Sequence, residues 1–285
     1  MKFVTYLYGG VEHVGVMTAD DAAVIPACEF GCDAKNMNEL IDVLGCTVPE
    51  IPENAKAVPM SEIKLLAPIL QPKHNVICLG LNYANHAAEA AAAFDSFKVK
   101  KGEATYFTKH VNRAVDPNGV IDGHFDINDS LDYEVELAVV IGKDAYKVKA
   151  EDAEEYIFGY TILNDVSARN LQTKHNQWFF GKSLDSFTPI GPCIVSGDVI
   201  GAKQPLGIRC YVNGEERQNS STDNLIFDIP YIIEDLSSGM TLPAGTVIST
   251  GTPEGVGMKC GKYLKSGDVV RCEIDGIGVL ENTVG

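Results

Sequence analysis

The chain has 285 residues, of which 45% are hydrophobic, and it carries a formal net charge of −16. This length and apolar content allow a large hydrophobic core, in one large domain or in one large and one small domain. The negative charge argues against a nucleic-acid partner and against an anionic membrane surface, because both require clustered Lys and Arg side chains.

Cysteine usage and the N-terminal sequence favour a cytoplasmic protein. The eight cysteines include no Cys-x-x-Cys pair, and Cys78, Cys193 and Cys210 lie in apolar runs, as expected of reduced core residues. The first residues alternate like a strand and lack the apolar segment of a signal peptide. No apolar run has the length needed to cross a bilayer, so we expect no membrane association.

Residues 1–67 are expected to form a small α+β domain. Short strands separated by Gly and Asp turns are predicted over residues 2–8, 11–17 and 22–26. A helix is predicted over residues 36–45, where a glycine ends it. A connector rich in proline and lysine, from residue 49 to about residue 74, is expected where the chain passes into the second expected domain, residues 68–285.

The second domain is predicted to be mainly β. The clearest strand patterns cover residues 75–80, 106–109, 133–141, 158–164, 208–212, 246–249 and 269–274. Helical patterns are fewer, over residues 86–94, 151–155, 167–172 and 225–236. Because strands and helices do not alternate regularly, this pattern favours a mainly-β fold with a few covering helices over a doubly wound sheet.

Acidic residues occupy one face of the strand over 133–141. Side chains alternate along a strand, so Glu134 and Glu136 share a face while Val135 and Leu137 point to the other. Two adjacent carboxylates repel one another unless a cation lies between them, and Mg²⁺ prefers such oxygen ligands. Asp165, after the next strand, is a candidate third ligand. The structural alternatives are a solvated strand face for the glutamates and a helix N-cap for Asp165.

Three further segments carry candidate functional groups. His86 and Glu89 share a helix face and suit a general-base dyad, although an ordinary surface pair has the same spacing. Lys182 follows an aromatic run and is either half-buried beside the carboxylates or a snorkelling lysine. The glycine-rich turn over residues 249–257 offers backbone N–H groups to an anion.

Taken together, these motifs resemble the fumarylacetoacetate hydrolase family over roughly residues 70–285. The matching motifs occur in the family's order: Asn82-Tyr83-x-x-His86-x-x-Glu89, Glu134-x-Glu136, Asp165-Val-Ser-Ala-Arg169, Lys182-Ser-x-Asp185 and Thr250-Gly-Thr-Pro-Glu-Gly-Val-Gly257. The resemblance implies a mixed β-sandwich roll, preceded by a small N-terminal domain and assembled as a homodimer.

The same resemblance implies roles for individual residues. Glu134, Glu136 and Asp165 would hold Mg²⁺ or Mn²⁺. His86 and Glu89, on a mobile lid helix, and Lys182 beside the metal would be catalytic. The implied substrate contacts are Tyr83, Lys109, Arg169, Gln172 and Thr252. The chain departs from the family at His110, where proline is common, and in the alanine-rich segment 87–105, so substrate identity is the least determined property.

The leading functional expectation is a metal-dependent enzyme that cleaves a C–C bond of a diketo or acylpyruvate-like 2-oxo acid by hydrolysis. A metal-stabilised enolate serves hydrolysis, isomerisation and decarboxylation equally. A 2-hydroxyhepta-2,4-diene-1,7-dioate isomerase and an oxaloacetate-type decarboxylase are therefore the alternatives. A non-catalytic metal-binding module is disfavoured, because such a module has no need of a water-activating dyad.

Overall fold

The computed structural model describes residues 1–85, 102–175 and 177–285. Residues 1–67 contain one helix, two 3₁₀ turns and five strands. The helix is α1 (Met37–Leu44), and the turns are η1 (Ala27–Phe30) and η2 (Met60–Glu62). The strands are β1 (Lys2–Tyr8), β2 (Val11–Met17), β3 (Ala23–Pro26), β4 (Val58–Pro59) and β5 (Lys64–Leu66).

The described part of residues 68–285 is rich in strands. These are β6 (Val76–Gly80), β7 (Thr105–Lys109), β8 (Val120–Ile121), β9 (Leu131–Asp132), β10 (Val135–Ile141), β11 (Ile157–Asn164), β12 (Ser167–Ala168), β13 (Ile190–Ser196), β14 (Gly207–Val212), β15 (Glu215–Ser221), β16 (Val247–Ser249), β17 (Val269–Ile274) and β18 (Gly278–Val284). The helical elements are η3 (Ala150–Tyr156), α3 (Arg169–Lys174), α4 (Phe179–Lys182), η4 (Thr222–Asn224), α5 (Ile229–Ser237) and α6 (Gly257–Cys260).

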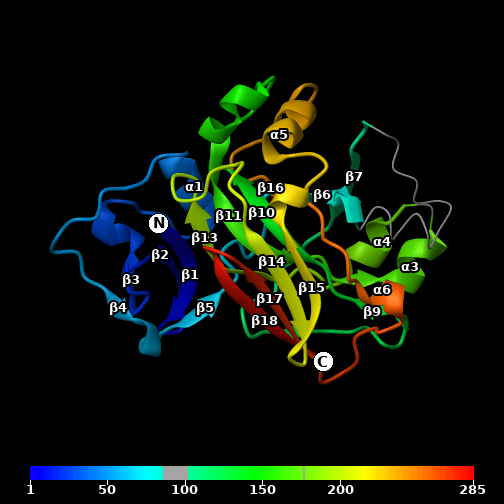
Figure 1. The fold of residues 1–285 in the computed structure, drawn as a ribbon. Helices are drawn as coiled ribbons and strands as arrows, with labels where there is room; N and C mark the ends of the chain where they lie inside the picture. The colour runs from blue at the N-terminus through cyan, green and yellow to red at the C-terminus, as the bar shows by residue number, and fades with distance from the viewer. Residues whose placement is uncertain (86–101, 176) are drawn as a thin grey trace.

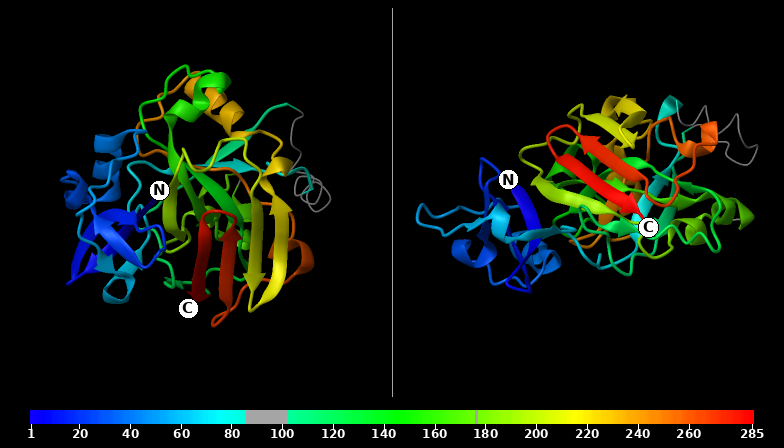
Figure 2. Two further views of the ribbon diagram at one scale, coloured as in Figure 1. Left: turned by 60° about the vertical axis from the view of Figure 1, so that its left-hand side comes forward. Right: turned by 90° about the horizontal axis from the view of Figure 1, so that it is seen from below.

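Two large sheets organise the molecule (Figure 1). The larger runs in the order β4-β3-β2-β1-β13-β11-β10-β16-β6-β7, with β5 paired to β1. The second runs in the order β15-β14-β17-β18-β8 and packs against β10, β11 and β13. Strand β1 pairs antiparallel with β13, which carries the sheet from the N-terminal strands into the centre of the molecule. Figure 2 shows the N-terminal strands gathered at one end of this arrangement.

The core lies between the two sheets because their facing strands alternate apolar side chains. Val135, Leu137, Val139 and Ile141 on β10 join one buried cluster with Ile208 and Cys210 on β14 and Val270 and Cys272 on β17. The opposite face of β10 contributes Ala138 and Val140 to a second cluster, which contains Leu40 and Ile41 of α1. Strand β10 is thus buried on both faces, and charged groups on it are removed from water.

Helix α1 forms where the sequence predicts it. The side chain of Asn36 accepts a hydrogen bond from the backbone N–H of Glu39, a favourable N-cap. Glu39 in turn accepts from the backbone N–H of Lys35. The helix ends at Gly45, whose positive φ of 58° suits glycine, and it buries one apolar face against the second cluster.

The mainly-β prediction is confirmed, and the strands predicted from alternation occur within one or two residues of their expected positions. Three helix predictions need correction. Residues 151–155 form a 3₁₀ helix. Helix α3 begins at Arg169 because residues 167–168 pair with β9. Helix α5 begins only at Ile229, after Asp228 accepts a capping hydrogen bond from the Tyr231 N–H. The helix predicted over 86–94 lies outside the described residues.

Strands β8, β13, β15 and β18 are absent from the sequence prediction, and the expected connector contains the short strands β4 and β5. The boundary proposed between residues 67 and 68 stays a prediction. Among the helices in the described ranges, none combines the length and apolarity needed to cross a membrane.

Candidate metal centre and active site

Three carboxylates meet at one end of the central strands. Glu134 directly precedes β10, Glu136 lies on it, and Asp165 directly follows the neighbouring strand β11. The pairing of β10 with β11, continued by the bond from the Asp165 N–H to the Glu134 carbonyl, brings the three together. Each offers one oxygen, and these atoms lie within 4.8 Å of one another.

The burial of these groups separates the functional interpretation from the structural alternatives. Glu136 is 1% exposed and Glu134 is 5% exposed, so the solvated-strand alternative is wrong. The residue at the N-cap of α3 is Ala168, so Asp165 is not a helix cap. Buried like charges at this distance are strongly unfavourable without cations, which the site supplies in part.

Two lysines neutralise Asp165. The Lys182 ammonium lies 2.7 Å from Asp165 Oδ2 and 2.8 Å from Glu134 Oε2, while Lys109 Nζ lies 2.5 Å from Asp165 Oδ1. Burial lowers the pKa of Lys182, but the adjacent Asp165 and Glu134 carboxylates outweigh it, and the pKa stands above its ordinary value. Lys182 is fully charged at neutral pH and is buried, not snorkelling.

Within the described ranges, Glu136 is the carboxylate of the triad that has no cationic partner. Its Oε2 accepts hydrogen bonds from Ser249 Oγ at 2.5 Å and from the Gly251 N–H at 2.9 Å. Among the described residues, no Lys, Arg or His nitrogen lies within ion-pair distance of it. Burial, followed by repulsion from Asp165 and Glu134, raises the pKa of Glu136 well above its usual range.

Arg169 extends the charged network from the opposite side. Its guanidinium lies 2.6 Å from Glu134 Oε1 and 2.8 Å from Asp132 Oδ2, and Nη1 donates to Gln172 Oε1 at 3.0 Å. Asp132 also accepts from the backbone N–H groups of Gly257 and Met258 at the start of α6. Counted over the described residues, the network therefore sets four carboxylates against three cations.

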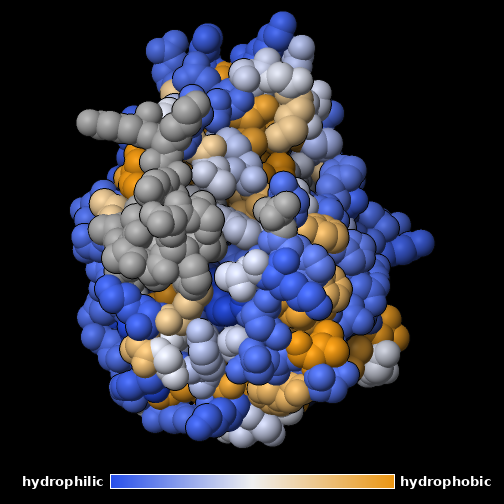
Figure 3. Space-filling view, turned by 90° about the vertical axis from the view of Figure 1, so that its right-hand side faces the viewer, coloured by the Kyte–Doolittle hydropathy of each residue, from blue (hydrophilic) through white to orange (hydrophobic). Residues whose placement is uncertain are grey.

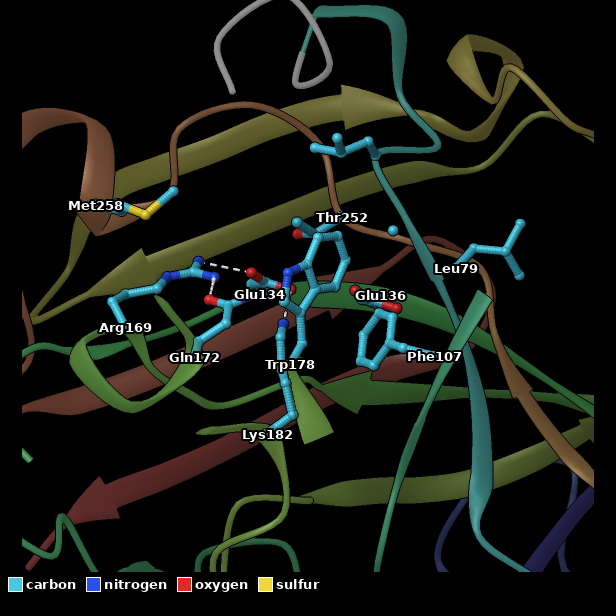
Figure 4. A pocket seen from close by; sticks show the side chains of 12 residues that line it. Leu79, Phe107, Glu134, Glu136, Arg169, Gln172, Trp178, Lys182, Thr252 and Met258 are labelled. Carbon is cyan, nitrogen blue, oxygen red and sulfur yellow. Dashed lines mark hydrogen bonds and ion pairs between the residues drawn. The ribbon is translucent and has the colours of Figure 1, made fainter. Parts of the chain in front are cut away.

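The remaining negative charge and the donor set fit a divalent cation. Carboxylate oxygens are preferred ligands of hard ions such as Mg²⁺ and Mn²⁺. The residues that would hold the ion are Glu134, Glu136 and Asp165. A cavity of about 30 Å³ adjoins Glu134 and Glu136. Its lining also includes Lys182, Arg169, Gln172, Thr252, Phe107 and Trp178, which Figure 4 shows gathered around the two glutamates.

The predicted substrate contacts occupy different depths in the structure. Arg169, Gln172 and Thr252 line the cavity. The Thr252 hydroxyl donates to the Val135 carbonyl and accepts from Gln218, so its proton is already used. Lys109 is buried and pairs with Asp165, and Tyr83 is fully buried. Neither is among the described residues lining the cavity.

His86 and Glu89 lie outside the described residues, so the predicted dyad stays a prediction, as does the lid. Three described groups were missed by sequence reasoning. Asp132 continues the i, i+2 alternation of Glu134 and Glu136, a signal that could have identified it. The sequence indicates Ser249 and Gly251 only as part of a turn suited to an anion. In the structure, the anion to which they donate hydrogen bonds is the Glu136 carboxylate.

Figure 3 shows the side of the molecule that carries α3, α4 and α6. Hydrophilic residues predominate there, and hydrophobic residues form separate groups among them. Trp178 and Phe107 form the aromatic part of the cavity wall.

Comparisons with known proteins identify the family of the chain. The family model "Fumarylacetoacetate (FAA) hydrolase C-terminal" matches residues 75–285. The oxaloacetate tautomerase YisK of Bacillus subtilis is 45% identical over 228 residues, covering 79% of this chain and 74% of that protein.

Two solved structures are also similar. The fumarylacetoacetate hydrolase from psychrophilic Exiguobacterium antarcticum has a TM-score of 0.86 at 38% identity, covering 100% of this chain and 99% of the other. The 2-hydroxyhepta-2,4-diene-1,7-dioate isomerase from Mycobacterium marinum has a TM-score of 0.73 at 31% identity, covering 100% and 98%. The fold, the carboxylate cluster and these matches agree: the chain belongs to the fumarylacetoacetate hydrolase family.

Proposed function

We propose that the protein is a divalent-metal-dependent tautomerase of a small 2-oxo acid, which interconverts the keto and enol forms, with oxaloacetate as the first candidate substrate. The observation that carries this proposal is the buried carboxylate triad, in which Glu136 has no cationic partner among the described residues, directly beside the charged Lys182. The name of the Bacillus subtilis relative supports the choice of reaction.

Tautomerisation requires little of the site. A base takes a proton from the carbon next to the 2-oxo group and an acid gives a proton to the 2-oxo oxygen, while no C–C bond breaks and no water is consumed. The predicted dyad of His86 and Glu89 is the candidate base. A divalent cation, when bound, would polarise the 2-oxo group and favour loss of the neighbouring carbon-bound proton. Lys182 supplies a fixed positive charge and a proton donor beside the carboxylates, where negative charge develops on the substrate oxygen.

Arg169 and Gln172 are suited to orient the acid. The Gln172 oxygen accepts from Arg169, which leaves the amide N–H₂ of Gln172 as a donor at the cavity wall. Arg169 itself is fixed by Asp132 and Glu134, so it adds positive charge with little freedom to move. A rigid arrangement of this kind orients a bound carboxylate without reorganisation.

Hydrolysis of a C–C bond is the second candidate, supported by the name of the Exiguobacterium antarcticum structure. It uses the same positive charge at Lys182 but also requires a base that activates water. The residues predicted for that role, His86 and Glu89, lie outside the described ranges. Tautomerisation also needs a base, but it requires no attacking water and breaks no C–C bond, so it asks less of the described residues than hydrolysis does.

The proposal is tested by following the absorbance of the oxaloacetate enol with Mg²⁺ or Mn²⁺, and by identifying products by NMR. We expect faster keto–enol interconversion with no loss of carbon. Lys182→Met should lower the rate by on the order of 10²–10⁴-fold. Lys149→Met, at an exposed lysine that pairs with Glu234, is the matched control and should retain the rate.

The possible outcomes separate the reaction types. Pyruvate and CO₂ from oxaloacetate would identify a decarboxylase, and two acids from an acylpyruvate would identify a hydrolase. No acceleration of any of the three reactions, with metal binding intact, would contradict an enzymatic role.

We also propose that Mg²⁺ or Mn²⁺ is the bound ion and that the protein forms a homodimer. The oxygen-only donor set supports the first proposal. The second rests on family membership alone. Light scattering at micromolar concentration tests the dimer, and a monomeric mass would exclude it.

A further inference from the structure

Leu81 adopts an unusual backbone conformation at the cavity. Its φ is +56°, in the left-handed region that a leucine side chain disfavours, and it is a lining residue. It directly follows Gly80, the last residue of β6. Backbone strain of this kind persists only where the surrounding structure enforces it, and such positions cluster at functional sites.

Asn82 is the residue that enforces this conformation. Its fully buried side chain donates to the Thr250 carbonyl at 2.8 Å and to the Phe227 carbonyl at 3.0 Å, and accepts from the Phe227 N–H at 2.8 Å. Its own carbonyl accepts from the Ile226 N–H at 2.7 Å. Four hydrogen bonds to two distant segments therefore fix the chain immediately after Leu81.

Trp178 forms the adjoining part of the wall. A β-carbon added at Gly80 would lie 2.4 Å from Cζ3 of Trp178, so the indole ring packs directly on this glycine. The ring centroid of Phe107 lies 5.3 Å from that of Trp178, and Lys182 Nζ lies 5.2 Å from the centre of the Phe107 ring. Trp178 is thereby positioned relative to the charged lysine, and Figure 4 shows the three side chains together.

The cavity inside this wall is small. Its volume is about 30 Å³, compared with about 290 to 610 Å³ for four other hollows of the structure. Space of this size holds roughly two or three water-sized groups. The carboxylate and 2-oxo oxygens of a substrate match that scale, so its remaining carbons would extend along the apolar part of the lining, which includes Leu81 and Trp178.

We propose that Leu81 and Trp178 form an apolar wall that determines specificity by limiting the length of the substrate tail. Leu81 is the residue to vary in a test, because its left-handed backbone places it in the lining of the cavity. This inference rests on the proposed function and narrows it to 2-oxo acids with a short tail. A longer tail would have to displace Leu81 or Trp178, and neither yields easily because both are fixed by their neighbours.

The test compares pyruvate, 2-oxobutanoate and 2-oxohexanoate as ligands of the Mg²⁺-loaded protein, by isothermal titration calorimetry. Fluorescence gives a second readout, because Trp178 is the single tryptophan of the chain. The variants are Leu81→Ala and Leu81→Gly. The control is Leu65→Ala, a half-buried leucine on β5 outside the described lining of the cavity.

In both Leu81 variants, the ratio of the affinity for 2-oxohexanoate to the affinity for pyruvate should be about 10-fold or more higher than in the wild type. The control should keep the wild-type ratio. Leu81→Gly should also melt at a higher temperature than Leu81→Ala, because glycine removes the strain at φ +56° and alanine does not. If one variant does not fold, the other still reports the binding ratio.

An unchanged binding ratio in a folded Leu81 variant would overturn the inference. If the wild type binds these acids without tautomerising oxaloacetate, the proposed reaction fails while the ratio still decides the role of Leu81. If the wild type binds none of them with Mg²⁺ loaded, both proposals fall together.

Discussion

Two sets of charged side chains on strands differ mainly in their access to water. On the outer face of the five-stranded sheet, Arg209 pairs with Asp275 at 2.9 Å and Arg271 with Glu273 at 2.6 Å, all in contact with solvent. In the carboxylate network around β10, the charges are almost fully buried, and among the residues that the structure describes, acids outnumber bases. The outer pairs are complete without further partners, whereas the buried network needs another cation to be balanced.

Exposed and buried charges differ in what they contribute to the free energy of folding. Exposed ion pairs contribute about 0–1 kcal/mol, since water already solvates both partners. Removing one partner from a buried pair leaves an uncompensated charge and costs about 3–5 kcal/mol. An excess of buried acid that the fold retains despite this cost indicates a ligand, and here the ligand chemistry is that of a divalent cation.

The largest expected effect is on metal binding. Glu136→Ala should reduce Mn²⁺ binding, measured by calorimetry, below detection, because it removes one of three ligands. Glu273→Ala, which removes a carboxylate from the outer sheet, should bind Mn²⁺ like the wild type. Equal Mn²⁺ affinity in the wild type and Glu136→Ala would refute the assignment of the site.

The next effect is on stability. Asp132→Ala should lower the free energy of unfolding by about 3–5 kcal/mol, because Arg169 and two backbone N–H groups of α6 lose their acceptor. Urea denaturation measures the change. Asp275→Ala on the outer sheet is the counterpart and should cost about 0–1 kcal/mol. Similar losses in the two variants would remove the distinction between the buried and exposed sets.

A smaller effect depends on pH. The raised pKa of Glu136 means that the folded, metal-free protein favours the protonated acid more than the unfolded chain does. Its contribution to stability is therefore complete below the ordinary pKa of glutamate and is lost as the pH rises toward the folded-state pKa. Metal-free Glu136→Gln should melt above the wild type at neutral pH, and the difference should shrink toward pH 4.

With saturating Mn²⁺ at neutral pH, the wild type should melt at a higher temperature than Glu136→Gln, since only the wild type gains stability from the ion. Thermal melts with and without Mn²⁺ measure both parts. A difference in melting temperature that does not change with pH would mean that Glu136 is ionised in the metal-free protein.

The smallest expected effect is at the outer sheet itself. Arg271→Ala should change the free energy of unfolding by about 0.5 kcal/mol, because its partners Glu273 and Glu281 remain hydrated. Added salt should reduce the difference further. A loss above about 2 kcal/mol would show that this face is covered in solution.

Much of the site follows from residue spacing. Glu134 and Glu136 could be placed on one face because side chains alternate, and the pairing of adjacent strands makes Asp165 a natural neighbour. The occupation of both Asp165 oxygens by Lys109 and Lys182 could not be predicted. Lys109 is on β7 and Lys182 on α4, and only the tertiary fold brings these elements together.

The missed strands have local causes. Strand β13 contains Gly191 and Pro192, which favour turns, and it forms because β1 and β11 pair with it on both sides. Strand β15 is polar, with the sequence Glu-Glu-Arg-Gln-Asn-Ser-Ser, and lies at a sheet edge where β14 is its pairing partner. Neither pattern alternates between apolar and polar residues, so pairing partners decide these strands rather than periodicity.

The antiparallel pairing of β1 with β13 has a consequence for truncation. A fragment beginning near residue 68 would lose β1 and leave one side of β13 without a hydrogen-bonding partner. That strand carries Ile190, Cys193, Ile194 and Val195, all buried in the intact chain. An apolar strand with an open edge is a template for intermolecular pairing. Residues 1–67 thus protect the larger sheet from self-association. The shortened protein should aggregate even though it retains Glu134, Glu136 and Asp165.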